Sequence, residues 1–256
     1  FKVGYYDYFS KENSCFTFDK CIESLEKLKE NSIVLLHASS HNPTGCDPTK
    51  EEWDKIIEVL QVRSLIPIVD CAYQGLGVSV DDDAYVIRKL AKLNLNFFVA
   101  QSFSKSIALY QQRTGVAHAV LANPSQYKAA FESAKLIARK MYSNPPAFGA
   151  YVANRVLTDD TLKSEWEEFL KSSRDRLKSL REELCKGLEA KDVNFDFSAI
   201  RRQIGMFALL PLSKEQAIKL KDDHSVFILE SGRVCLAALN KNNIDYVIGA
   251  IAEVLR

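Results

Sequence analysis

The stretch "SIVLLHASSHNPTGCDPTKEEWDKIIEVLQVRSLIPIVDCA", residues 32–72, decides the fold. It begins and ends with apolar runs, at 32–38 and 66–72, that do not alternate cleanly and therefore indicate strands buried on both faces. Between them, 47–64 begins with an Asp or Thr cap and is typical of an amphipathic helix. Its apolar stripe consists of Trp53, Ile56, Ile57 and Leu60. Strand, helix and strand in this order predict a right-handed parallel unit.

The same alternation continues along the chain. We expect a helix at 81–94 and two more buried parallel strands at 96–103 and 115–122. The cysteines Cys71 and Cys235 lie in apolar, strand-like surroundings and are expected to be buried thiols. Together these patterns predict an α/β fold with a mainly parallel sheet.

The pattern changes after Pro146. A helix is expected at 146–160, followed by a long amphipathic helix at 161–191. Short strands near 205–212 and 226–239 and a closing helix at 243–256 complete the chain. We therefore expect a large α/β domain at 1–160 and a smaller α+β domain at 161–256, which begins with the long connecting helix.

The composition excludes several classes of function. The chain has 34 basic and 33 acidic residues and a net charge of +1, which gives no broad field for nucleic acid or an anionic membrane. No apolar run approaches the roughly 20 residues that cross a bilayer. The cysteines form no CxxC pair and have no histidine cluster beside them, so we expect no metal site and a reducing compartment. We expect the cytoplasm, with the mitochondrial matrix or another organelle as the alternative. No GxGxxG follows a predicted strand, which argues against a nicotinamide-binding domain.

Polar residues follow the predicted strands at their carboxyl ends, where open α/β sheets bind ligands. The residues are His37, His41, Asn42, Asp70, Tyr73, Ser102, Ser104, Lys105 and, before the fourth strand, Arg113. A lysine can form a Schiff base with an aldehyde, and an aspartate can keep a pyridine nitrogen protonated. Tyrosine and asparagine can bind a ring phenolate, while serines and an arginine can bind a phosphate. Each residue alone is also compatible with an ordinary loop, but together they predict a pyridoxal phosphate site.

Six blocks of the sequence carry a family resemblance. They are "LLHASSHNPTGCDPTKEEW", "DCAYQGLG", "AQSFSKSIALYQQRTG", "YSNPPAFGA", "QIGMF" and "SGRVCLAAL". In their order and spacing they resemble the class I, fold-type I aminotransferases, and within these the members that act on aspartate. The resemblance implies a three-layer large domain, a homodimer with shared active sites, and ping-pong transamination between L-aspartate and 2-oxoglutarate, giving oxaloacetate and L-glutamate.

The resemblance also implies roles for individual residues. Lys105 would attach the pyridoxal 5'-phosphate and move the proton, and Asp70 would pair with the ring nitrogen, supported by His37. Tyr73 and Asn42 would hold the phenolic oxygen, with Asn42 also close to the substrate. Ser102, Ser104 and Arg113 would lie beside the cofactor phosphate. Arg233 would bind the α-carboxylate of the substrate.

Arg139 would decide specificity. It matches the arginine that reaches across the dimer to the distal carboxylate of a dicarboxylic substrate, which a guanidinium binds with two parallel hydrogen bonds. The ordinary alternative is a solvated arginine at a helix end, between Lys135 and Lys140.

Two alternative functions stay open at this point. The first is an aromatic or broad-specificity aminotransferase. The second is a catalytically silent paralogue that acts only as a binding or dimerising module. The family has further chain upstream of the position of Phe1, including a phosphate loop at a helix start, so this chain is expected to be a fragment or an incomplete gene product with exposed sheet surfaces.

Overall fold

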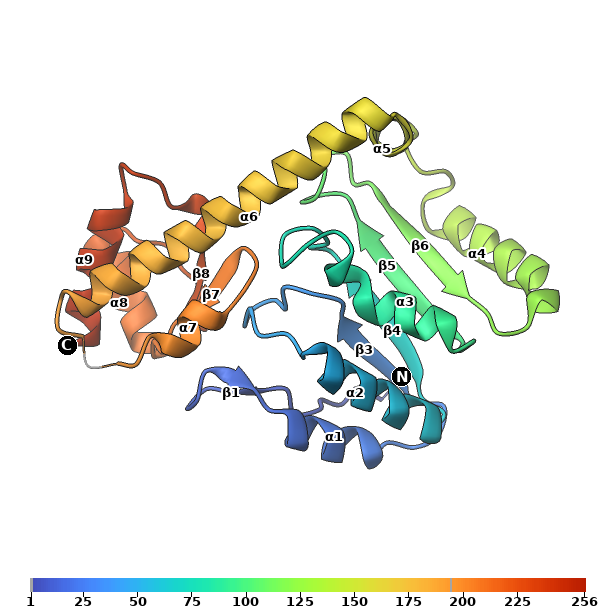
Figure 1. Cartoon of the computed structure of the whole chain (residues 1–256), viewed down its shortest axis with the longest axis horizontal. Coiled ribbons are helices and arrows are strands. Elements are labelled where there is room, and N and C mark those ends of the chain that lie inside the picture. The colour runs from blue at the N-terminus through green and yellow to red at the C-terminus, as the bar shows by residue number, and fades with distance from the viewer. Residues whose placement is uncertain (1, 194) are drawn as a thin grey trace.

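The computed structural model describes residues 2–193 and 195–256 and is organised around one sheet and one long helix (Figure 1). The long helix, α6 (Asp160–Glu189), runs from beside the sheet to a group of C-terminal helices (Figure 1). Two hydrophobic clusters form the cores, one around the sheet and one around the C-terminal half of α6. None of the helices in the described ranges is long and apolar enough to cross a membrane.

The sheet contains four strands in the order β3 (Ile33–His37), β4 (Ile66–Cys71), β5 (Phe97–Ser102) and β6 (Gly115–Val120). The β3–β4 and β4–β5 pairs are parallel, and the β5–β6 pair is antiparallel. The predicted α/β class with a mainly parallel sheet is therefore confirmed.

The prediction that 115–122 forms a buried parallel strand is wrong. Strand β6 runs antiparallel to β5, with Ser102 opposite Gly115, and most of its residues are exposed. The reason is the connection: residues 103–114 contain only turns and no helix to carry the chain back across the sheet, so the chain reverses direction beside β5.

Three helices pack on one face of the sheet: α1 (Phe18–Glu26), α2 (Lys50–Val62) and α3 (Tyr85–Lys92). Helix α2 begins at a capping box in which Thr49 and Glu52 each bond the other's backbone N–H. All four predicted stripe residues of α2 are buried. The helix predicted at 81–94 is split into a 3₁₀ turn, η1 (Asp82–Ala84), and α3.

The opposite face of the sheet is exposed, so the prediction of strands buried on both faces is wrong for the described residues. In β3, Val34 and Leu36 face the helices, whereas Ile33 and Leu35 are 49% and 55% exposed. Phe98 of β5 is 44% exposed. Because side chains alternate across a strand, the pattern assigns these apolar residues to the uncovered face.

The C-terminal cluster is built from α6 together with α7 (Ser198–Arg202), α8 (Lys214–His224) and α9 (Ile244–Leu255). It also contains a two-stranded sheet of β7 (Phe207–Leu209) and β8 (Arg233–Cys235), followed by η3 (Leu236–Ala238). These strands are shorter than predicted. All six cysteines are free thiols, but only Cys71 of the two predicted buried thiols is buried, since Cys235 is half-buried.

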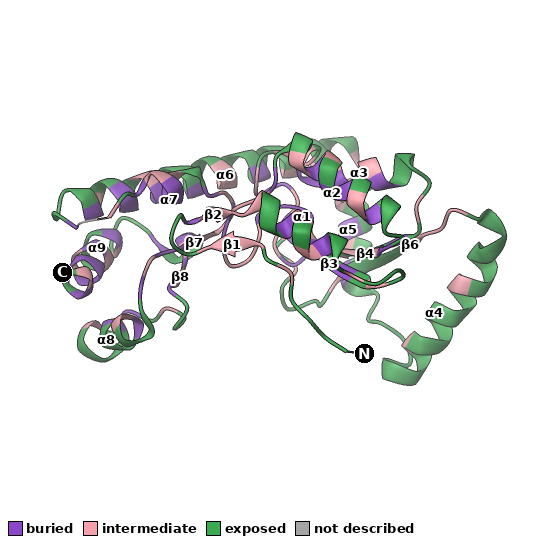
Figure 2. Ribbon diagram, turned by 90° about the horizontal axis from the view of Figure 1, so that it is seen from below, coloured by how far each residue is buried: buried purple, intermediate pink, exposed green. Residues whose placement is uncertain are grey.

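Elements that sequence periodicity missed complete the fold. They are the hairpin of β1 (Phe9–Ser10) and β2 (Cys15–Phe16), η2 (Pro124–Gln126) and α4 (Tyr127–Tyr142), in addition to α1, α7 and α8 described above. The predicted helix at 146–160 is α5 (Phe148–Thr158). Helix α4 lies away from the sheet, is exposed along almost its whole length and has no buried residue (Figure 2).

Candidate active site

The carboxyl ends of β3, β4 and β5 bring the predicted residues to one edge of the sheet. His37, the last residue of β3, lies opposite Asp70 of β4, and Asp70 lies opposite Ala100 of β5. The carboxylate of Asp70 acts to raise the pKa of His37, but burial prevails and lowers that pKa. At neutral pH the His37 ring is therefore neutral and can orient the carboxylate beside it.

Lys105 and Tyr73 meet above this edge. The Nζ atom of Lys105 lies 4.7 Å from the centroid of the Tyr73 ring. Tyr73 is only 6% exposed, and burial raises the pKa of its phenol, while a hydrogen bond with the Asn42 side chain opposes that shift. The charge of Asp70 also raises this pKa, which places Asp70 within electrostatic reach of Tyr73. An amine, a phenol and a carboxylate thus share one small region.

Arg233 joins this region from the C-terminal cluster. Its Nη1 donates a hydrogen bond of 2.6 Å to Oδ1 of Asn42. The guanidinium carbon lies 4.3 Å from the centroid of the Phe207 ring, and that ring meets Tyr73 edge-on at 6.1 Å. The guanidinium is therefore held between an amide and an aromatic ring, directly beside the phenol.

The loop after β3 is held in place by its own hydrogen bonds. The carboxylate of Asp47 accepts hydrogen bonds from the backbone N–H groups of Ser40 and His41, and the N–H of Asn42 donates to Nδ1 of His37 at 3.4 Å. The His41 ring stacks on Tyr8 at 4.0 Å, and burial lowers the pKa of His41 to about 3. This scaffold presents Asn42 to both Tyr73 and Arg233.

The same loop touches the C-terminal cluster through glycines. Gly45 accepts a hydrogen bond from the N–H of Ile204, and Gly205 lies so close to Ser40 that a Cβ atom at residue 205 would be 2.5 Å from Cβ of Ser40. Both glycines have positive φ angles, of 65° and 80°. The two halves of the site therefore meet through backbone contact that a larger residue would obstruct.

The three residues predicted to bind a phosphate are only partly brought together. The N–H of Ser104 donates to Oγ of Ser102 at 3.2 Å, and Ser104 is buried. Arg113 is exposed, and its Nη1 donates to the carbonyl oxygen of Tyr110 at 3.0 Å. Ser102 and Ser104 are thus bonded to each other in the segment that leads into Lys105, whereas the guanidinium of Arg113 is engaged with its own loop.

Arg139 is not part of this cluster. It lies in the last turn of α4 and is exposed. Helix α4 itself lies beyond β6, on the opposite side of the sheet from the C-terminal helices (Figure 1). The sequence prediction gave Arg139 a role only across a dimer, and within one chain it has no contact with the cluster around Lys105.

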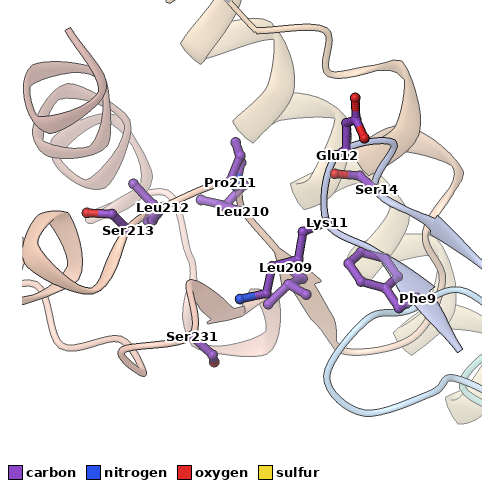
Figure 3. Close-up of a pocket in the computed structure, with 10 residues that line it drawn as sticks. All are labelled: Phe9, Lys11, Glu12, Ser14, Leu209, Leu210, Pro211, Leu212, Ser213 and Ser231. Carbon is purple, nitrogen blue, oxygen red and sulfur yellow. The ribbon is translucent and has the colours of Figure 1, made fainter. Parts of the chain in front are cut away.

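A separate cavity of about 320 Å³ lies between the β1–β2 hairpin and the C-terminal cluster (Figure 3). Its walls include Phe9 and Lys11 from the hairpin region and Leu209 to Ser213 from the segment that leads into α8. None of the predicted site residues lines it. The convergence of amine, carboxylate, phenol and guanidinium at the sheet edge makes that edge the stronger candidate for chemistry.

Sequence reasoning missed the supporting residues. Phe207 lies within the block "QIGMF" without an assigned role, and the aromatic ring in that block was the available signal. Asp47 and Asp83 bind backbone amides of the site loops, a role that only the folded chain reveals. Within the described residues, no group of three or more His, Cys, Asp or Glu side chains is arranged to hold a metal ion.

Comparison with known proteins gives consistent results. The family described as aminotransferase class I and II matches residues 1–251. The aspartate aminotransferase of Pseudomonas aeruginosa is 37% identical over 255 residues, which cover 100% of this chain and 64% of that protein. The aromatic-amino-acid aminotransferase of Escherichia coli is also 37% identical, with the same coverage. The chain thus spans about 64% of the length of these relatives.

A solved structure is similar over the whole chain. It is the aromatic-amino-acid aminotransferase of Burkholderia pseudomallei, covalently bound to pyridoxal phosphate. The TM-score is 0.96 at 37% sequence identity, and the alignment covers 100% of this chain and 64% of that one. The observed arrangement of sheet, long helix and C-terminal cluster is therefore shared with that enzyme.

Proposed function

This chain belongs to the family of class I and II aminotransferases, and on that basis we propose that the complete protein transfers the amino group of L-aspartate to 2-oxoglutarate. The products are oxaloacetate and L-glutamate. The observation that carries the proposal is the position of the Lys105 amine over Tyr73, with Asp70, Asn42 and Arg233 around it. We also propose the division into domains at 1–160 and 161–256, which the two hydrophobic clusters support.

The residues at the sheet edge fit pyridoxal 5'-phosphate as the cofactor. The donor set offers an amine for an aldehyde, a carboxylate for a pyridine nitrogen, and a phenol with an amide for a ring oxygen. The hydroxyls of Ser102 and Ser104, together with Arg113, would hold the phosphate. Pyridoxal phosphate supplies, when bound, an aldehyde that condenses with amines and a ring that accepts electrons from the substrate.

The side chains of this protein then have distinct tasks. Lys105 would bind the aldehyde carbon, and its amine, released when the amino group of the substrate takes its place, would take up the α-proton of the substrate and later give it back. Asp70 would keep the pyridine nitrogen protonated, with His37 as its support, and Tyr73 and Asn42 would orient the ring oxygen. Arg233 binds the α-carboxylate, for which its guanidinium is held in place by Asn42 and Phe207.

A homodimer is part of the proposal. Helix α4 exposes a series of large apolar side chains, which a second copy of the chain would cover. They include Tyr127, Phe131, Leu136, Ile137 and Met141. In such a dimer Arg139 would reach the active site of the other copy and bind the distal carboxylate. We propose the cytoplasm as the compartment, since the six free thiols suit a reducing environment, with the mitochondrial matrix as the alternative.

An aromatic or broad-specificity aminotransferase is the second candidate, because aromatic-amino-acid aminotransferases match at the same identity. A substitution at Arg139 distinguishes the two candidate functions. Arg139→Leu is expected to lower kcat/KM for aspartate by about tenfold or more and to leave kcat/KM for phenylalanine nearly unchanged, since only aspartate has a second carboxylate. If phenylalanine is the better substrate of the wild type and Arg139→Leu affects both equally, the aromatic function is correct.

The role of Lys105 is tested with Lys105→Ala in the complete protein. The variant is expected to lose the yellow, lysine-linked chromophore on addition of pyridoxal phosphate and nearly all turnover. Lys219→Ala, at an exposed lysine of α8, is the matched control and keeps both. Full turnover in Lys105→Ala would contradict the proposed function, and a wild type without chromophore would favour a silent binding module.

A further inference from the structure

Helix α6 donates hydrogen bonds to the backbone of three loops that carry the site. Nε1 of Trp166 bonds the carbonyl oxygen of Ser106 at 2.6 Å, and Nη1 of Arg174 bonds that of Gly75 at 2.5 Å. Nη2 of Arg181 bonds the carbonyl oxygens of Gly205 at 2.8 Å and Phe207 at 3.1 Å.

Each of these loops carries or contacts a candidate site residue. Ser106 directly follows Lys105, and Gly75 is two residues after Tyr73. Phe207 packs against the guanidinium of Arg233. One helix thus contacts the lysine loop, the tyrosine loop and the carboxylate-binding side of the site.

The three donors lie on the same side of the helix. Trp166, Arg174 and Arg181 are eight and seven residues apart, which at 3.6 residues per turn confines them to a stripe of about 80°. At 1.5 Å per residue the stripe is about 22 Å long. A continuous α-helix is stiff over this length, so α6 can set the distance between loops that have no direct bond to each other.

Arg181 is the least expected of the three. It is 4% exposed and takes part in none of the ion pairs found in the described residues; it is held by carbonyl oxygens, and its Nε has no partner. Burial lowers the pKa of its guanidinium to about 10. An apolar residue of similar volume would fill the same space without the cost of burying a charge. Packing alone therefore does not explain why an arginine occupies this place.

We propose that Arg181 is a positioning residue for substrate binding: by holding the carbonyls of Gly205 and Phe207, it keeps the Phe207 ring against Arg233 and orients that guanidinium toward a carboxylate. The proposal rests on the function proposed above. Trp166 does the corresponding task for Lys105 through Ser106, on the other side of the site.

The test compares variants in the complete, cofactor-loaded protein. Steady-state kinetics with aspartate gives kcat and KM, and calorimetry gives the Kd of succinate, a dicarboxylate without an amino group that cannot react. Arg181→Met is expected to raise both KM and the succinate Kd about tenfold and to change kcat less than about twofold, because misplaced binding groups weaken positioning. Arg181→Lys keeps a donor for the carbonyls and recovers part of the affinity.

Two further variants separate positioning from stability. Leu180→Ala removes a buried neighbour in the same core and is expected to lower Tm while leaving the succinate Kd unchanged. Trp166→Phe is expected to lower kcat and to leave the succinate Kd unchanged, since it acts on the lysine loop.

The proposal is overturned if Arg181→Met lowers Tm as Leu180→Ala does and leaves the succinate Kd at the wild-type value. If Arg181→Met does not fold, Phe207→Leu replaces it: an unchanged succinate Kd in that variant would equally overturn the proposal. A wild type inactive on aspartate would refute the proposed function, whereas the succinate affinities would still decide the role of Arg181.

Discussion

Asp83 offers the sharpest prediction about stability. Its carboxylate is 2% exposed and accepts three backbone hydrogen bonds from the loop that follows Tyr73. The donors are the N–H groups of Gly75 at 2.8 Å, Gly77 at 2.9 Å and Val78 at 2.9 Å. Burial raises the pKa of this carboxyl, and the three amides oppose that shift.

Asp83→Ala leaves three N–H groups without their acceptor. A buried donor without a partner costs about 1–3 kcal/mol. Only the Gly75 N–H is fully buried, whereas those of Gly77 and Val78 are partly accessible and can bind water instead, so we expect a total cost of about 2–3 kcal/mol. Asp83→Asn keeps one acceptor oxygen but turns an amide N–H₂ toward at least one of the donors, so it should cost about 1–2 kcal/mol. From most to least stable, the predicted order is wild type, Asp83→Asn and Asp83→Ala.

The assay is urea unfolding at pH 7 followed by far-UV circular dichroism, with the free energy of unfolding taken by linear extrapolation. Asp81→Ala, two residues away and exposed, is the control and should change this free energy by less than about 0.5 kcal/mol. A loss below about 1 kcal/mol in Asp83→Ala would refute the reasoning, since a satisfied network of this kind cannot be so weakly stabilising.

Three other predictions follow from residues described above. His41, with its pKa lowered to about 3, stays neutral in the folded chain, whereas the unfolded chain takes up a proton below about pH 6.5. The wild type therefore loses stability as pH falls from 7 to 5, and His41→Phe does not have this loss. Measured by urea unfolding, the free energy of unfolding of His41→Phe should rise by up to about 2 kcal/mol relative to that of the wild type over this pH range. A difference between the two proteins that stays the same at pH 7 and pH 5 would contradict a neutral His41. Gly205→Ala should cost about 2–4 kcal/mol in thermal unfolding because its Cβ would strike Ser40, whereas Gly249→Ala, with open space around it in α9, should gain about 0.5–1 kcal/mol. Leu90→Ala, in the core under the sheet, should cost about 2–5 kcal/mol by the same assay, and a cost no larger than that of Leu93→Ala at the exposed helix end would contradict its role in the core.

Much of the fold was predictable because its strands and helices have strong local signals. The strands at 33–37, 66–71 and 97–102 and the helices α2, α5, α6 and α9 all lie where the apolar patterns place them. The direction of β6 was not predictable from its composition, because Val and Ala suit parallel and antiparallel strands alike. The absence of a helix from the preceding connection, residues 103–114, is what distinguishes the two.

The candidate site, like the fold, could be predicted from the sequence only in part. Lys105, Asp70, Tyr73, Asn42 and Arg233 were all named from the sequence, and the fold brings them to one edge. Their ligand and substrate roles stay predictions. The donors that hold the site together were not found, because Trp166 and Arg181 lie in a helix whose pattern indicates only an amphipathic surface.

The bond between Arg233 and Asn42 joins residues that are 191 positions apart in the chain. At a translation rate of about 5–20 residues per second, roughly 10–40 s pass between the synthesis of the two partners. During that interval the sheet and its helices can already assemble on the ribosome, since their core residues end well before α6. The arginine proposed to bind the substrate carboxylate is consequently added last, to a nascent chain that already contains Lys105, Tyr73 and Asp70.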